Sequence, residues 1–250
     1  MTDLQEDNLD GLRNVVRLWI YGIALVFIAL AIFLLILPDL LRVVLLPDAT
    51  ATICFFIIGL FIFCIYVNTT WLRRKFPVNW IISCLIAACL AFGTVTVLPE
   101  GHVVHVLLLS LEVLVMMVLI QVVGSWSLPG CPAMTYLLLA WFVFVVMTSV
   151  LMVACCVHLP GKVYAFEAAV HFVLWQIAFP IIGFQAQVIS GHWDNLPPIL
   201  DRPLCSTVLL IDFLACFVFL DCADDIAYEY YYLSKKSTSD FLGRVIKSQM

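Results

Sequence analysis

The sequence predicts an all-α fold, a polytopic membrane bundle of seven hydrophobic helical segments. Hydrophobic residues make up 64% of the chain and charged residues only 12%, whereas a soluble domain is nearer half apolar and a quarter charged. The apolar residues also form long runs, near the ~20 residues that cross a bilayer as a helix. Because backbone polar groups cannot stay unpaired in lipid, runs of this length are helices.

Turn-forming residues separate these runs. The connectors Pro99-Glu100-Gly101 and Pro129-Gly130 are examples, and such clusters favour turns. Short connectors between long apolar runs indicate one compact bundle. We expect membrane crossings at residues 16–37, 51–67, 80–98, 103–123, 134–157, 163–188 and 204–220.

The domain organisation follows from the same pattern. Residues 1–14 form a polar N-terminal segment, residues 15–222 the helical bundle, and residues 223–250 a short polar C-terminal tail. The first apolar run is long enough to remain as an anchor after the polar start, so we expect no cleaved signal peptide.

Several function classes are excluded by what the chain lacks. Its twelve Lys and Arg residues are scattered, and without a basic face we expect no nucleic-acid partner. The His-Glu-x-x-His and Gly-x-Ser-x-Gly motifs of common hydrolases are absent. We therefore expect no enzyme, no cofactor and no metal centre.

Orientation is indicated by the positive residues near the segment ends. The cluster Arg73-Arg74-Lys75 lies between the second and third segments, so this loop and the N-terminus should be cytoplasmic. If all seven segments cross, Lys and Arg divide evenly between the two faces. A re-entrant last segment gives a cytoplasmic excess, and the charge rule favours it. The acidic residues that follow the segment leave a full crossing open.

Three stretches carry short motifs in order. Arg73, Arg74, Pro77 and Asn79 precede the third segment, residues 187–191 run from Gln187 to Gly191, and residues 209–220 form an apolar run with a central Asp. These stretches resemble the basic Pro-x-Asn signature, the Asp-Thr-Gln region and the final helix of the transmembrane Bax inhibitor motif family, also called the lifeguard family. The resemblance covers about residues 12–222 and marks the chain as a divergent member.

One departure from the family affects its expected chemistry. The resemblance implies facing aspartates that form a proton-sensitive latch over a calcium leak path. Here Gln185 stands where the first Asp is expected, and only Asp212 remains. An amide both donates and accepts, so Gln185 and Asp212 can hydrogen-bond. Without repulsion between two carboxylates, we expect pH gating to be weakened or rebuilt.

Ionisable residues inside crossings are the other candidates, because a charge there costs about 2.5–3.5 kcal/mol on some scales. Asp212 is a gating carboxylate or a protonated, hydrogen-bonded Asp. Glu112 lies midway through the fourth segment, where it could supply a second carboxylate. Glu167 and His171 are four residues apart and share a helix face. They could bind a cation, relay protons or form an interfacial pair.

The resemblance implies a slow calcium leak and restraint of cell-death signalling, in the endoplasmic reticulum, the Golgi or the plasma membrane. The partners would be the lipid bilayer, calcium ions and other membrane proteins. The alternative is a non-conducting regulatory or scaffold protein of the same fold. Convergence of Glu112, Gln185 and Asp212 on one polar path would favour conduction, and sealing of these residues by Leu and Phe would favour the scaffold.

Overall fold

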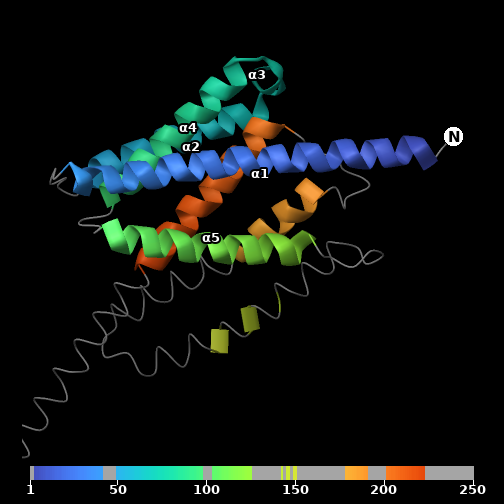
Figure 1. The fold of residues 1–250 in the computed structure, drawn as a ribbon. Coiled ribbons are helices and arrows are strands. Elements are labelled where there is room, and N and C mark those ends of the chain that lie inside the picture. The colour runs from blue at the N-terminus through green and yellow to red at the C-terminus, as the bar shows by residue number, and fades with distance from the viewer. Residues whose placement is uncertain are drawn as a thin grey trace, which may run out of the picture.

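The structure, a computed structural model, describes residues 3–41, 49–97, 103–125, 142, 145–146, 149–150, 178–190 and 201–222 (Figure 1). Regular structure within these ranges is entirely helical, as predicted. Most of the predicted crossing at 134–157 and the first part of that at 163–188 lie outside the described residues.

Seven helices are described, and five of them are long and apolar enough to cross a membrane. The protein is therefore an integral membrane protein that crosses the bilayer several times, and five of the seven predicted segments are confirmed. In chain order the helices are α1 (Asp3–Leu40), α2 (Ala49–Asn68), α3 (Thr70–Arg74), α4 (Val78–Val97), α5 (Val103–Ser125) and two further helices, Ala178–Ser190 and Arg202–Cys222.

Helix α1 is longer than its apolar run. It begins at Asp3, and its membrane span begins only at Asn14. The residues before Asn14 include Leu, Gln, Glu and Arg, which are good helix formers. The boundary predicted at residue 14 is thus a change of polarity within one continuous helix.

Helices α2 and α4 form a tightly packed antiparallel pair joined by α3 (Figure 1). Glycines lie at their contact: a Cβ at Gly59 would come within 2.9 Å of Leu90, and one at Gly93 within 3.3 Å of the Phe56 ring. Small residues let membrane helices approach closely. The hydroxyls of Thr52 and Thr96 add a hydrogen bond of 2.9 Å across the pair.

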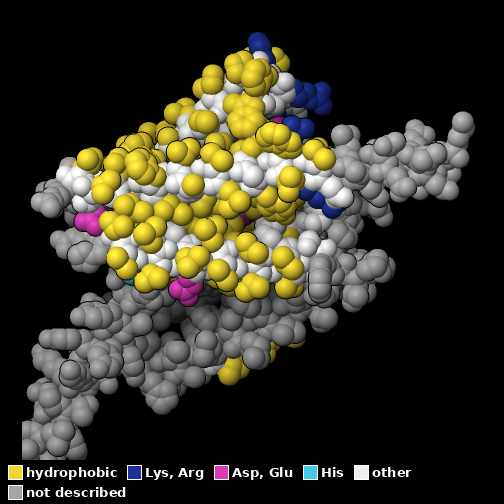
Figure 2. Space-filling view, viewed as in Figure 1, with side chains coloured by type: hydrophobic (Ala, Val, Ile, Leu, Met, Phe, Trp, Pro, Cys, Tyr) yellow, Lys and Arg dark blue, Asp and Glu magenta, His cyan; other side chains and the backbone are white. Residues whose placement is uncertain are grey.

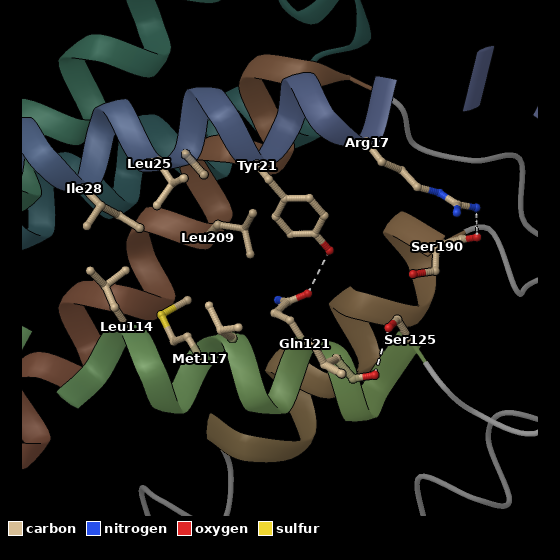
Figure 3. Close-up of a pocket in the computed structure, with 13 residues that line it drawn as sticks. Arg17, Tyr21, Leu25, Ile28, Leu114, Met117, Gln121, Ser125, Ser190 and Leu209 are labelled. Carbon is tan, nitrogen blue, oxygen red and sulfur yellow. Dashed lines mark hydrogen bonds between the residues drawn. The ribbon is translucent and has the colours of Figure 1, made fainter. Parts of the chain in front are cut away.

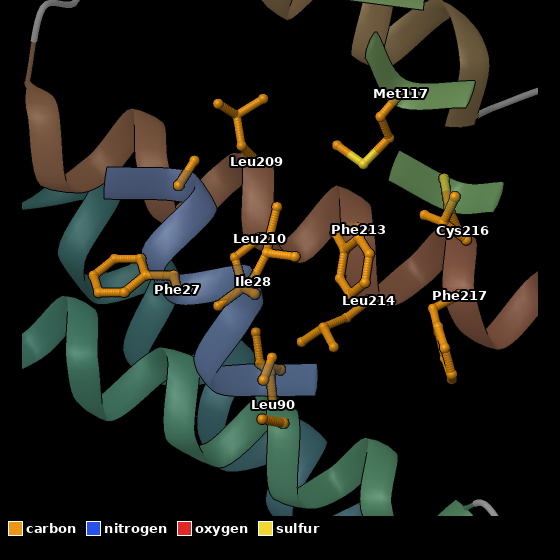
Figure 4. Packing of buried hydrophobic residues seen from close by; sticks show 14 of the residues in the cluster. Phe27, Ile28, Leu90, Met117, Leu209, Leu210, Phe213, Leu214, Cys216 and Phe217 are labelled. Carbon is orange, nitrogen blue, oxygen red and sulfur yellow. The ribbon is translucent and has the colours of Figure 1, made fainter. Parts of the chain in front are cut away.

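Helix Arg202–Cys222 lies at the centre of the bundle. A larger share of its span is buried than in any other described span, and Leu210, Phe213 and Phe217 are fully buried. Figure 4 shows Leu210 beside Ile28 of α1, and the three side chains belong to one buried cluster with Ile28 and with Leu90 of α4. The buried hydrophobic core of the described residues is therefore organised around the last helix.

The prediction of a re-entrant last segment is wrong. Residues 202–222 form one unbroken helix of 21 residues, long enough to cross. It begins beside Arg73, whose charge acts on Asp201, and ends where Asp221 contacts His105 at the start of α5. The count of positive residues favoured a re-entrant segment because it included the lysines of the distant tail. Whether a helix can cross the bilayer depends instead on the length of its apolar run.

The described part of the bundle has one basic end. Arg17 near the start of the α1 span and Arg73 and Arg74 of α3 lie there, whereas Asp39 accepts a hydrogen bond from the Val103 N–H (3.0 Å) at the opposite end. That bond places a carboxylate at the N-terminus of α5, where the helix dipole favours negative charge. This basic end is the one that the charge rule predicts to be cytoplasmic.

The sides of the bundle are covered with apolar side chains (Figure 2). Leu18 is 75% exposed and Val104 is 68% exposed, and similar residues follow along α1, α2 and α5. Soluble monomers rarely expose continuous apolar surface of this extent. A bilayer supplies the apolar surroundings that this surface requires.

Candidate functional site

Gln185 and Asp212 meet inside the bundle, as the sequence predicts. Helix Ala178–Ser190 carries Gln185 and helix Arg202–Cys222 carries Asp212 at its midpoint. The Gln185 Nε2 atom donates a hydrogen bond of 3.3 Å to Asp212 Oδ1. The pair therefore joins one amide and one carboxyl group that lie on different helices.

The pair leaves two oxygen atoms without partners. Gln185 Oε1 and Asp212 Oδ2 are both buried and have no hydrogen-bond partner among the described residues. Each unpaired buried polar atom costs about 1–3 kcal/mol. Fully buried Phe213 and Cys216 follow Asp212 on its own helix. The site is therefore a polar spot in apolar surroundings, with acceptor atoms available to a proton donor or a cation.

Glu112 does not join this pair. Its side chain is exposed on α5, whereas the buried face of α5 includes Ser110, Val113 and Met117. Convergence of Glu112, Gln185 and Asp212 on one polar path, the arrangement that would favour conduction, is thus not found among the described residues. The helical register explains this, because Glu112 lies away from the buried face.

Of the other residues that the sequence suggested for the site, none that the structure describes joins the pair. Glu167, His171 and Gly191 lie outside the described residues. Gln187 is fully buried, and neither of its amide atoms has a hydrogen-bond partner within the described part of the chain. It lies two positions after Gln185, on another side of the same helix. Gln187 is therefore not part of the Gln185–Asp212 pair.

The Pro-x-Asn motif forms the turn between α3 and α4. The Asn79 side chain donates a hydrogen bond of 3.2 Å to the Arg73 carbonyl, and the Asn79 N–H donates one of 3.1 Å to the Lys75 carbonyl. The Phe76–Pro77 peptide bond is cis. Here Asn79 closes a turn, a structural role that needs no ligand.

Arg73 also contributes to the electrostatics of the basic end. Asp201, which immediately precedes the last helix, is partly buried. Burial raises the pKa of Asp201 above its ordinary value, and the positive charge of Arg73 opposes that rise. No cluster of three or more His, Cys, Asp or Glu residues suited to a metal ion occurs in the described ranges.

A cavity of about 470 Å³ lies between α1, α5 and the two C-terminal helices of the described chain (Figure 3). Tyr21 donates a hydrogen bond of 3.1 Å from its hydroxyl to Gln121 Oε1, and Arg17 donates one to the Ser190 carbonyl. No sequence motif marks this cavity. No local signal could, because its partners are 100 and 173 positions apart.

Comparison of the chain with protein-family models, curated proteins and solved structures gives no match. The likeness to the Bax inhibitor motif family rests on the short motifs alone, and it stays a prediction.

Proposed function

We propose that this integral membrane protein is a divergent relative of the Bax inhibitor motif family that passes calcium slowly across an internal or surface membrane and restrains cell-death signalling. Asp212 is the gate, and Gln185 is its partner in the closed state. The observation that carries the proposal is their hydrogen bond at the middle of Arg202–Cys222, the most buried of the described spanning helices.

The chemistry of the pair suits a weak cation gate. A carboxylate oxygen and an amide carbonyl oxygen are ligands that calcium accepts. Both Asp212 Oδ2 and Gln185 Oε1 lack hydrogen-bond partners among the described residues. An ion that reaches them would satisfy both atoms, whereas the apolar surroundings keep the path closed most of the time. A slow leak is the expected result.

Calcium efflux from liposomes containing the purified protein tests this proposal. Asp212→Asn removes the charge and adds an N–H that can donate to Gln185 Oε1, so the closed pair gains a hydrogen bond. A net gain of about 1 kcal/mol lowers the open population roughly fivefold. We expect the leak to fall by at least that factor.

Glu112→Gln is the matched control, because it neutralises a carboxylate of the same bundle that is exposed and outside the pair. We expect Glu112→Gln to leak at the wild-type rate. A wild-type leak unchanged by Asp212→Asn would remove Asp212 from the ion path. An equal fall in the calcium leak in both variants would show that loss of any carboxylate charge in the bundle lowers the leak, so the effect would not be specific to Asp212.

A second candidate function is a non-conducting regulatory or scaffold protein that acts through other membrane proteins. It is favoured by the outward position of Glu112 and by the fully buried Leu210, Phe213 and Phe217 on the helix of Asp212. Folded wild-type protein that leaks no faster than empty liposomes would reject conduction and leave this function.

A further inference from the structure

The cavity between α1 and α5 offers hydrogen-bond donors at one end. None of the described residues that line it is acidic. Among the described residues, the only hydrogen-bond acceptors of Arg17 are two neutral oxygens, Asn14 Oδ1 at 3.3 Å and the Ser190 carbonyl. A guanidinium has five N–H donors, so its charge and part of its donor capacity remain available to a ligand.

Gln121 provides an independent observation at the same cavity. Its side chain is 9% exposed, and its Nε2 atom has no hydrogen-bond partner among the described residues. The Gln121 Oε1 atom accepts from Tyr21, which fixes the amide so that its nitrogen faces the side of Leu209 and Met117 (Figure 3). An unpaired buried amide donor of this kind calls for an acceptor from a ligand.

The rest of the cavity suits an acyl chain. Beyond Gln121 its walls are apolar, with Ile28, Leu114 and Met117 among them. Its volume of about 470 Å³ lies in the usual ~300–1,000 Å³ range of small-molecule sites. Leu25 and Val118 at its rim are 56% and 57% exposed, so a lipid tail can enter sideways from the bilayer.

We propose that this cavity binds one acyl chain of an anionic glycerophospholipid. The lipid phosphate meets Arg17, an ester carbonyl accepts the free Gln121 N–H, and the chain lies between α1 and α5. Arg17 is at the basic end of the described bundle, which matches the anionic leaflet of a cytoplasmic membrane face.

A glycerophospholipid fits better than a free fatty acid because the two donors lie at different depths. Tyr21, the partner of Gln121, is one helical turn deeper than Arg17, about 6 Å along α1. A phospholipid carries a phosphate and, beyond the glycerol, an ester carbonyl. A fatty acid has a single polar group and would leave one donor unpaired.

Native mass spectrometry of the full chain in detergent tests the proposal with three probes: palmitoyl-oleoyl phosphatidylglycerol, the matching phosphatidylcholine and oleate. We expect the wild type to prefer phosphatidylglycerol. Arg17→Gln removes a charged hydrogen bond and should weaken that binding about tenfold or more. Gln121→Met should weaken the binding of both phospholipids, because both carry the ester.

Arg74→Gln is the matched control, since Arg74 is exposed at the same end and does not line the cavity. It should bind as the wild type does. Ala24→Leu adds volume inside the cavity without changing charge and should reduce binding of every lipid.

Equal loss of phosphatidylglycerol in Arg74→Gln and Arg17→Gln would overturn the proposal in favour of surface electrostatics. If the wild type binds phosphatidylcholine and phosphatidylglycerol with equal affinity, and Arg17→Gln binds phosphatidylglycerol as tightly as the wild type does, the proposed recognition of an anionic headgroup is wrong. Oleate bound as tightly as phosphatidylglycerol, with Gln121→Met unchanged, would replace the phospholipid with a fatty acid.

Discussion

Gly124 of α5 allows a close approach that a single added methyl group should prevent. A Cβ at Gly124 would lie 2.8 Å from the Gly183 carbonyl oxygen and 2.9 Å from Ala186 Cβ. Both neighbours belong to helix Ala178–Ser190, and a helical carbonyl cannot rotate away without disturbing its own helix. Gly124→Ala must therefore push the two helices apart.

The stability change expected for Gly124→Ala is best compared with that of Gly22→Ala, a matched control. Gly22 on α1 is also helical, and a Cβ there would meet nothing within 4 Å. Gly22→Ala should stabilise the protein by up to ~1 kcal/mol through helix propensity alone. Gly124→Ala makes the same gain and loses about 1–3 kcal/mol to overpacking. The difference between the two variants isolates the packing effect.

Thermal unfolding of the purified variants in detergent micelles, followed by tryptophan fluorescence, measures that difference. For a chain of this size 1 kcal/mol shifts the Tm by roughly 2–4 °C, so Gly124→Ala should melt roughly 2–12 °C below Gly22→Ala. Equal melting temperatures for the two variants would refute the close contact between α5 and helix Ala178–Ser190.

Two further predictions concern the last helix. The Ser206 hydroxyl lies 2.9 Å from the Ile20 carbonyl of α1 and 2.8 Å from the Arg202 carbonyl of its own helix, whereas the only partner of the Thr207 hydroxyl among the described residues is the Pro203 carbonyl of its own helix at 2.7 Å. Ser206→Ala should therefore cost about 0.5–1 kcal/mol and more than Thr207→Val, and the reverse order in unfolding experiments would contradict this. Burial raises the folded-state pKa of Asp201. The stabilisation of the fold by the protonated Asp201 carboxyl, relative to the ionised form, is therefore complete below the unfolded-state pKa of about 3.9. It is lost as the pH rises through the folded-state pKa. The Tm of Asp201→Asn minus that of the wild type should therefore increase from pH 4 to pH 7, and a decrease would show a lowered pKa instead.

Local apolar length made much of the fold predictable. The predicted crossing at 103–123 and the observed span Val103–Ser125 differ by two residues, because transfer of apolar side chains into lipid depends on composition along the chain. The pairing of Gln185 with Asp212 was also anticipated, through the family resemblance, and the hydrogen bond is present.

Side-chain orientation was much less predictable. The sequence left open whether Glu112 shares a path with Asp212 or is separated from it, and in the structure the Glu112 side chain is exposed. Apolar residues lie on every side of α2 and α5, so their sequences give little indication of which face packs inward. A helix of this kind turns according to its neighbours, which only the assembled bundle specifies.

The sequence by itself determined the membrane environment, the helical class and the ends of five spanning segments, since each depends on hydrophobicity within one stretch of chain. The tertiary structure alone decided that the last helix is central and unbroken, and that Arg17, Tyr21 and Gln121 share one cavity. These contacts join residues 100 or more positions apart or depend on helix rotation. They arise from the packing of whole helices against one another, which no single segment encodes.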